Sequence, residues 1–91
     1  MNIENFATVL KALAHPIRLK IACGLLKKSE CNVNTMCEKL QVSQPTVSQH
    51  LTILKNAGVI VGVRNGNRIC YKIENPEIKK IIQSFEIEMC D

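Results

Sequence analysis

The stretch Ser43–Ile60 reads SQPTVSQHLTILKNAGVI and decides the fold. Ser43 is a typical helix N-cap, Pro45 fits a first helical turn, and apolar residues recur at helical spacing. These signals predict a helix that runs to Asn56 and is closed by Gly58 as its C-terminal cap. Its buried stripe is predicted to consist of Val47, Leu51 and Leu54.

A shorter helix is predicted directly upstream. Residues Thr35–Leu40 carry a helical apolar spacing with Asn34 as the expected cap, and Gln41 and Val42 form the turn. A short helix, a tight turn and a second helix follow one another as in a helix-turn-helix. The segment Glu30–Val33 is expected to add a short strand before them.

Two segments rich in β-branched residues follow the helix-turn-helix. We predict strands over Val59–Arg64 and Arg68–Ile73, joined through Asn65-Gly66-Asn67, because Asn-Gly accepts the positive φ of a tight turn. Such a hairpin forms the wing of a winged helix-turn-helix. The expected fold class is therefore mainly α with a β-hairpin wing, in a single domain over residues 1–91.

Amphipathic helices are predicted towards both ends of the chain. The first covers Asn2–Leu13, the second runs from Pro16 to near Lys27 and Lys28, and the last follows Asn75 and Pro76. The stripe of the first helix comprises Ile3, Phe6, Leu10 and Leu13, and that of the last comprises Ile78, Ile81, Ile82, Phe85 and Met89. A chain this short buries only about 60% of its unfolded surface. The apolar last helix is therefore expected to meet a second subunit.

Basic residues dominate where the helix-turn-helix and the wing lie. The chain has 12 basic and 8 acidic residues, yet residues 43–72 hold four basic and no acidic side chains. A stretch without carboxylates suits a polyanion partner, because each phosphate contact releases counterions. Arg64 and Arg68 flank the hairpin tip, where they are placed to contact phosphates or enter a minor groove.

The predicted recognition helix also exposes short polar side chains, which bond to phosphates or to base edges in the major groove. These candidates are Gln44, Thr46, Ser48, Gln49 and His50. Two simpler interpretations stay open at this point. Ser43 acts only as a helix cap, and His50 only packs against a neighbouring helix.

Other function classes find little support in the sequence. No Ser-His-Asp set, phosphate-cradling glycine loop or carboxylate pair can be assembled, so we expect no enzyme and no cofactor. No apolar run approaches the ~20 residues that cross a bilayer, so we expect a cytoplasmic protein without a membrane partner. The five cysteines are expected to be mostly reduced in that compartment.

Three segments together resemble the ArsR/SmtB family of winged-helix repressors over nearly the whole chain. They are LKALAHPIRLKI (Leu10–Ile21), Ser43–Ile60 and RNGNRICYKI (Arg64–Ile73). The resemblance implies a homodimer, joined by the first and last helices, that binds a palindromic double-stranded DNA operator and is released by an effector. On that pattern the DNA-facing residues are Ser43, Gln44, Thr46, Ser48, Gln49 and His50, and the wing residues are Arg64, Asn65, Gly66, Asn67 and Arg68.

The effector sites differ within this family, so the fold does not choose the ligand. Cys23, Cys90 and the tail that begins at Phe85 resemble the persulfide-sensing branch. This resemblance implies that reactive sulfur species are the inducer and join the Cys23 and Cys90 thiols through added sulfur. The bridge is then expected to shift the dimer away from its DNA-binding state.

Metal or metalloid sensing stays open as the alternative. The zinc-type site of the family needs Asp and His on the last helix, whereas the only histidines here are His15 and His50. Its arsenic-type Cys-x-Cys is replaced by Asn32 and Asn34. No metal is therefore expected at either site, and a thiol-based metal or arsenite site remains the alternative because such ions favour soft ligands. Its ligands would come from Cys31, Cys37 or Cys70, of which Cys70 is otherwise a packing residue of the wing.

Overall fold

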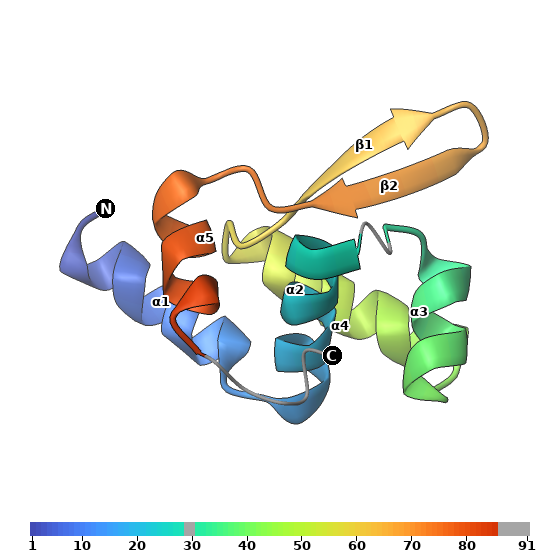
Figure 1. Ribbon diagram of the computed structural model, residues 1–91, viewed down its shortest axis with the longest axis horizontal. Coiled ribbons are helices and arrows are strands. Elements are labelled where there is room, and N and C mark those ends of the chain that lie inside the picture. The colour runs from blue at the N-terminus through green and yellow to red at the C-terminus, as the bar shows by residue number, and fades with distance from the viewer. Residues whose placement is uncertain (29–30, 86–91) are drawn as a thin grey trace.

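The computed structural model describes residues 1–28 and 31–85. Within these ranges, helices pack around an apolar core and a two-stranded hairpin projects from them (Figure 1). The elements are α1 (Ile3–Leu13), α2 (Pro16–Lys28), α3 (Val33–Leu40), α4 (Gln44–Asn56), β1 (Val61–Asn65), β2 (Arg68–Lys72) and α5 (Pro76–Gln83). The predicted fold class, a mainly α winged helix-turn-helix, is confirmed.

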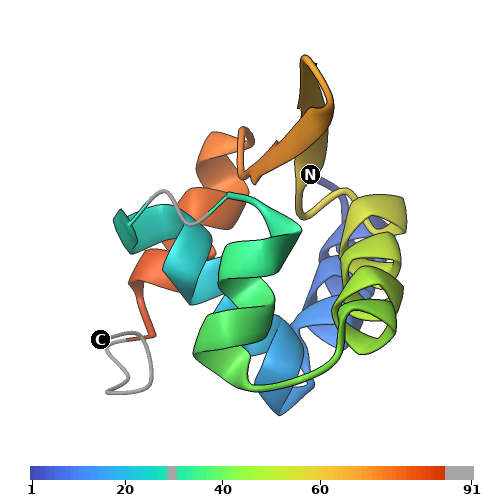
Figure 2. The same ribbon diagram turned by 90° about the vertical axis from the view of Figure 1, so that its right-hand side faces the viewer.

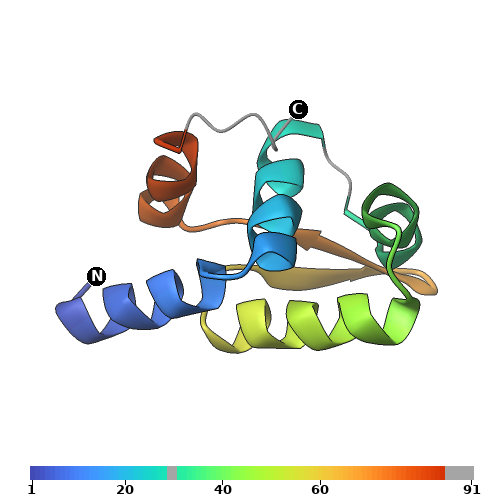
Figure 3. The same ribbon diagram turned by 90° about the horizontal axis from the view of Figure 1, so that it is seen from below.

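The core gathers around α2. Figure 3 shows α3 and α5 on opposite sides of α2, with α4 lying along one side of the molecule. Side chains that are almost completely buried include Leu13, Cys23, Val47, Leu54, Ile60 and Ile78. The predicted start of the first strand at Val59 is wrong by two residues, because Val59 and Ile60 are buried in this core and β1 begins only at Val61.

The helix α4 has the limits predicted for it. Ser43 is the N-cap, and the chain leaves the helix through Gly58 at a φ of +81°. The Gly58 amide donates to the carbonyl of Lys55, and the Val59 amide donates to that of Leu54, both at 3.0 Å. This pair of bonds is a Schellman motif, in which a left-handed residue closes the helix. Gly58 is the C-terminal cap expected from the sequence.

The start of α3 differs from the prediction. Asn32, rather than Asn34, is the N-cap, and its Oδ1 accepts from the Thr35 amide at 2.8 Å. Val33 therefore belongs to the helix. The strand predicted over Glu30–Val33 is wrong for residues 31–33, and Glu30 lies outside the described residues. The segment before α3 nevertheless makes a backbone hydrogen bond to β2: the Tyr71 amide donates to the Cys31 carbonyl at 2.9 Å.

The hairpin is antiparallel and points away from the helices (Figure 2). Its register pairs Val61 with Lys72 at the base and Asn65 with Arg68 at the tip. The turn therefore has two residues, Gly66 and Asn67, and the positive φ of 67° falls on Gly66. Only glycine adopts such a φ without strain, which explains its place at the tip. The second strand ends at Lys72, one residue before its predicted limit.

The terminal helices are used differently from what their sequence pattern predicts. Asn2 is the cap of α1 rather than its first residue, and the Ile3, Phe6 and Leu10 side chains of its stripe are 86%, 40% and 41% exposed. In α5 the stripe residues Ile78 and Ile82 are buried within the same chain. Ile81 and Phe85 of the same predicted stripe are only half-buried, and the predicted contact of this helix with a second subunit stays a prediction. Ile3, Phe6 and Leu10 form the exposed apolar side of α1, and further exposed apolar side chains lie on α4 and the wing: Ile53, Val63 and Ile69.

The last helix is also shorter than predicted. It ends at Gln83 with Ser84 as C-cap, so Phe85 follows the helix instead of extending its stripe. Met89 lies outside the described residues. Among the helices that are described, none combines the length and apolarity needed to cross a membrane.

Candidate nucleic-acid interface

The N-terminal half of α4 presents an uncharged polar face. Val47, Leu51 and Leu54 anchor the opposite face in the core. Gln44, Ser48 and Gln49 are exposed as a result, since residues three or four apart share a helix face. Thr46 is half-buried, and its Oγ1 lies 2.9 Å from Oγ of Ser43, whose Oγ also accepts from the Thr46 amide at 3.4 Å. Ser43 is therefore the N-cap of α4. Its contact with DNA stays a prediction.

His50 is turned towards α2 rather than away from the protein. The Arg18 guanidinium donates from Nη1 to Nδ1 of His50 at 3.1 Å, and its Nε donates to the carbonyl of Ala12. The His50 ring centroid lies 4.5 Å from that of His15, whose Nδ1 accepts from the Ile17 amide at 3.1 Å. These contacts support the packing interpretation of His50. Its DNA-binding role stays a prediction.

The surroundings of His50 favour its neutral form. Burial lowers the pKa of His50 below its usual 6.5, and the charges of His15 and Arg18 lower it further. A neutral imidazole retains the lone pair that accepts from Arg18. The sequence gives no sign that Arg18 donates to His50, because it does not show that α2 packs beside this part of α4.

The wing places its two arginines on different faces. Arg64 pairs with Ile69, and Asn65 pairs with Arg68. Since successive side chains of a strand alternate between faces, Arg64 and Arg68 point to opposite sides of the hairpin. Both are exposed, and neither has an ion-pair partner among the described residues. Both charges are available to an external anion.

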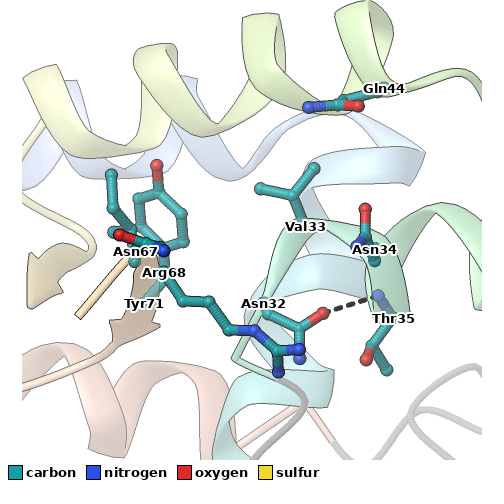
Figure 4. Close-up of a pocket in the computed structure, with 9 residues that line it drawn as sticks. Asn32, Val33, Asn34, Thr35, Gln44, Asn67, Arg68 and Tyr71 are labelled. Carbon is teal, nitrogen blue, oxygen red and sulfur yellow. Dashed lines mark hydrogen bonds between the residues drawn. The ribbon is translucent and has the colours of Figure 1, made fainter. Parts of the chain in front are cut away.

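A groove of about 470 Å³ separates the wing from the helix-turn-helix (Figure 4). Its lining comes from α3 with its cap, from the first residue of α4 and from the wing: Asn32, Val33, Asn34, Thr35, Gln44, Asn67, Arg68, Ile69 and Tyr71. Among the described residues, none with a carboxylate lines it, and Arg68 is the only charged one that does. Side-chain amides, two hydroxyls and one cation fit phosphates and base edges better than a cationic or wholly apolar ligand. Arg64 does not line it.

The cysteines fall into separate regions. Cys23 in α2 is 1% exposed, as expected for the buried face of its helix, and Cys90 lies outside the described residues. Cys31 and Cys70 form a disulfide with their Cα atoms 4.7 Å apart. The expectation of mostly reduced cysteines is therefore wrong for this pair and for Cys23, which is also disulfide-bonded. Cys70 is thus more than a packing residue. The sequence hid the pairing because β2 meets the start of α3 only in the folded chain.

The alternative metal site gains no ligand set from the described residues. Cys37 lies half-buried in α3 as a free thiol, while Cys31 is bonded to Cys70 instead of being paired with Cys37. Within residues 1–28 and 31–85, no three His, Cys, Asp or Glu side chains gather closely enough to hold a metal ion.

Comparisons with known proteins give the same architecture. The model of the arsR family of bacterial regulatory proteins matches residues 15–61. The transcriptional repressor PagR of Bacillus anthracis is 41% identical over 83 residues, which cover 91% of this chain and 83% of PagR. Its crystal structure has a TM-score of 0.82 at 40% identity, covering 90% of this chain and 93% of that chain.

Two further proteins are similar. The biofilm growth-associated repressor of Agrobacterium fabrum is 36% identical over 84 residues, covering 92% of this chain and 71% of that protein. The homodimeric winged helix-turn-helix DNA-binding domain Mb0332 of Mycobacterium bovis has a TM-score of 0.82 at 27% identity, covering 90% of this chain and 75% of that chain.

Proposed function

The chain belongs to the arsR family and is a transcriptional repressor, and on this premise we propose that it binds a palindromic operator as a homodimer that reactive sulfur species release. The observation that carries the DNA-binding part is the groove between α4 and the wing. There Gln44 and Arg68, from different elements, line one hollow to which no described carboxylate contributes.

In this proposal α4 enters the major groove by its N-terminal half. The exposed amides of Gln44 and Gln49 bond to base edges, and Ser48 bonds to a base or a phosphate. The wing then lies along the backbone, where Arg64 and Arg68 contact phosphates from its two faces. The absence of acidic residues between positions 43 and 72 keeps this surface free of repulsion from the duplex.

The proposed dimer uses the exposed apolar side of α1. Ile3, Phe6 and Leu10 line this side, and a hollow of about 230 Å³ beside it is formed by Leu10, Leu13, Ala14, Leu19 and Phe85. Contiguous apolar surface of this kind marks interaction sites. A second copy would cover it by two-fold symmetry. The homodimeric Mb0332 domain supports this pairing, and two-fold symmetry matches a palindrome.

The proposed release involves Cys23 and Cys90 and rests on their resemblance to the persulfide-sensing branch. One thiolate takes the outer sulfur of a glutathione persulfide and releases glutathione, while the other attacks the inner sulfur and releases hydrogen sulfide. The protein persulfide then displaces glutathione from the mixed disulfide and closes a trisulfide. Two protein thiols and two persulfides thus yield one trisulfide, two glutathiones and one hydrogen sulfide. The new bridge ties α2 to the tail of the chain.

The test measures DNA binding and covalent state together. A duplex enriched by the reduced protein from a random-sequence pool is labelled, and its binding is followed by fluorescence anisotropy. The measurement is repeated after treatment with glutathione persulfide, hydrogen peroxide, arsenite or zinc, with the intact mass recorded each time. We expect tight binding by the reduced dimer and loss of affinity after persulfide, with a mass gain of bridging sulfur.

Two results would contradict this proposal at different points. Failure to enrich any duplex would remove the DNA-binding part. Release by arsenite or zinc, with no response to persulfide, would move the effector site to Cys31, Cys37 and their neighbours while leaving the repressor function in place.

A further inference from the structure

The wing is covalently joined to the start of the helix-turn-helix through the middle of β2. Cys31 directly precedes the cap of α3, Cys70 lies in β2, and 39 positions separate them in sequence. Their Cα distance of 4.7 Å falls in the ~4.4–6.8 Å range of native disulfides. Beside them, the Tyr71 amide donates to the Cys31 carbonyl at 2.9 Å. That backbone bond joins the same two segments as the disulfide.

We propose that Cys31 and Cys70 form a second, reversible redox site, whose disulfide fixes the wing against α3 and strengthens DNA binding. The redox site itself stands on the geometry of the pair. Its effect on DNA rests on the proposed function. This site is separate from Cys23 and Cys90, because it joins other elements and needs no added sulfur.

The wing is the part of the fold that such a bond would restrain. All residues from 62 to 69 are exposed, whereas Cys70 and Tyr71 are half-buried and Ile73 is buried. The hairpin is therefore attached to the body mainly through the last residues of β2 and those that follow it. Residues that move freely before binding lose entropy when DNA orders them. A disulfide at Cys70, two residues from Arg68, orders the wing before DNA binds, so less entropy is lost on binding.

The crosslink also encloses the whole candidate interface. The loop between Cys31 and Cys70 contains α3, α4 and the hairpin turn. Gln44 and Arg68 both lie inside it and line the same groove. Closing the loop thus restrains the wing relative to the recognition helix.

The oxidation balances with a peroxide as the oxidant. One thiolate attacks a peroxide oxygen and becomes a sulfenic acid, and hydroxide leaves and is protonated to water. The second thiol then attacks the sulfenic sulfur, forms the S–S bond and releases another water. Two thiols and hydrogen peroxide give one disulfide and two waters. A dithiol reductant reverses the reaction by thiol–disulfide exchange and leaves as its own disulfide.

Access favours this pair over the buried cysteine. Cys31 and Cys70 are each half-buried, which lets a small oxidant approach, whereas Cys23 is 1% exposed. Among the described residues, Cys37 is the competing thiol, because it lies in α3 and is half-buried too. Any test must therefore separate Cys31 from Cys37.

The test uses the full chain with Cys37→Ser, reduced by dithiothreitol or treated with stoichiometric hydrogen peroxide. Trypsin leaves Cys31 and Cys37 together in residues 29–39 and places Cys70 in residues 69–72, so this substitution makes the crosslinked peptide unambiguous. Amide hydrogen exchange reports the wing, and anisotropy reports affinity for the enriched duplex. Cys70→Ser in the same background is the matched control.

We expect a crosslink between these two peptides, slower exchange over residues 62–69, and DNA affinity higher on the order of threefold to tenfold in the oxidised form. The Cys70→Ser control should show none of these changes. No crosslink, or a crosslink with unchanged wing exchange, would overturn the proposal, and so would equal DNA affinity in both states. If neither state binds DNA, the proposed function fails, while mass and exchange still decide whether the redox site exists.

Discussion

Arg18 donates from Nη1 to Nδ1 of His50 across 3.1 Å, and this bond joins α2 to the predicted recognition helix. The bond requires a neutral imidazole, because protonated Nδ1 has no lone pair to accept with. The His15 ring also lies beside His50, with 4.5 Å between the two ring centroids. The stability of the helix-turn-helix is thereby linked to pH.

The first prediction concerns that linkage. Burial, His15 and Arg18 lower the folded-state pKa of His50 below 6.5, so the unfolded chain takes up the proton first as the pH falls. Folding stability should therefore drop as the pH falls below about 6.5 and stop dropping below the folded pKa. Urea midpoints at about pH 7.5 and about pH 5.5 measure this drop. The variant His50→Gln should show a smaller drop, and an equal drop would contradict the linkage.

A second prediction compares the wing arginines. Arg68 lines the groove beside α4, whereas Arg64 is not among the residues that line it. Arg68→Ala should therefore weaken DNA binding more than Arg64→Ala. Because each phosphate contact contributes about one unit to the salt slope of the affinity, the double variant should lose at most about two units. Anisotropy titrations at several salt concentrations measure both quantities.

Lys79→Ala is the control for these arginines, since Lys79 is an exposed cation on α5, away from the groove. It should leave the slope nearly unchanged. If Arg68→Ala had as little effect as this control, the proposal that the wing contacts DNA would be wrong.

The third prediction separates two asparagines near the start of α3. The sequence favoured Asn34 as cap, but Asn32 Oδ1 accepts from the Thr35 amide at 2.8 Å, and Asn34 is exposed inside the helix. Asn32→Ala should therefore reduce the free energy of unfolding by about 0.5–2 kcal/mol. Asn34→Ala should have little effect, because Ala is the better helix former. Urea denaturation of both variants distinguishes the two caps, and the reverse order would restore the sequence-based assignment.

Local signals were sufficient for much of the fold. The cap at Ser43, the Schellman closure at Gly58 and the turn at Gly66 all depend on neighbouring residues, and the structure has each of them. The start of α3 was harder, because Asn32 and Asn34 are equally good caps and only tertiary context selects between them. Local pattern also could not show that Val59 is needed in the core.

The candidate site was predictable only in part. Its polar residues and arginines follow from composition and from the resemblance. The contacts that arrange them are non-local: Arg18 meets His50, and Cys31 meets Cys70, across long stretches of sequence. The helical period of apolar residues predicts an apolar stripe, but it does not show whether the same chain or a second subunit covers that stripe. In α5 the stripe is used within the chain, whereas in α1 it is exposed.

The fourth prediction tests that exposed stripe. Leu10 is 41% exposed on α1 and borders the apolar hollow near Phe85. Leu10→Glu should leave the monomer folded, because the side chain is not in the core, but should dissociate the proposed dimer by placing a carboxylate in an apolar contact. Sedimentation velocity measures the state of assembly. Ile53→Glu, at a similarly exposed position on α4, should remain dimeric, and a dimeric Leu10→Glu variant would place the interface elsewhere.

The fifth prediction assigns the inducer response to one cysteine pair. Cys90→Ser should bind the enriched duplex as the parent chain does, because no proposed DNA contact involves residue 90, but glutathione persulfide should no longer release it. The buried Cys23 would then lack the partner thiol of the proposed trisulfide. Cys37→Ser is the matched control, since Cys37 is a free, half-buried thiol in α3, and it should respond like the parent chain. Anisotropy before and after persulfide, with the intact mass of each sample, measures the response.

Normal release of the Cys90→Ser variant would refute the dithiol mechanism. Loss of the response in Cys37→Ser instead would transfer the sensing role to α3, next to the recognition helix.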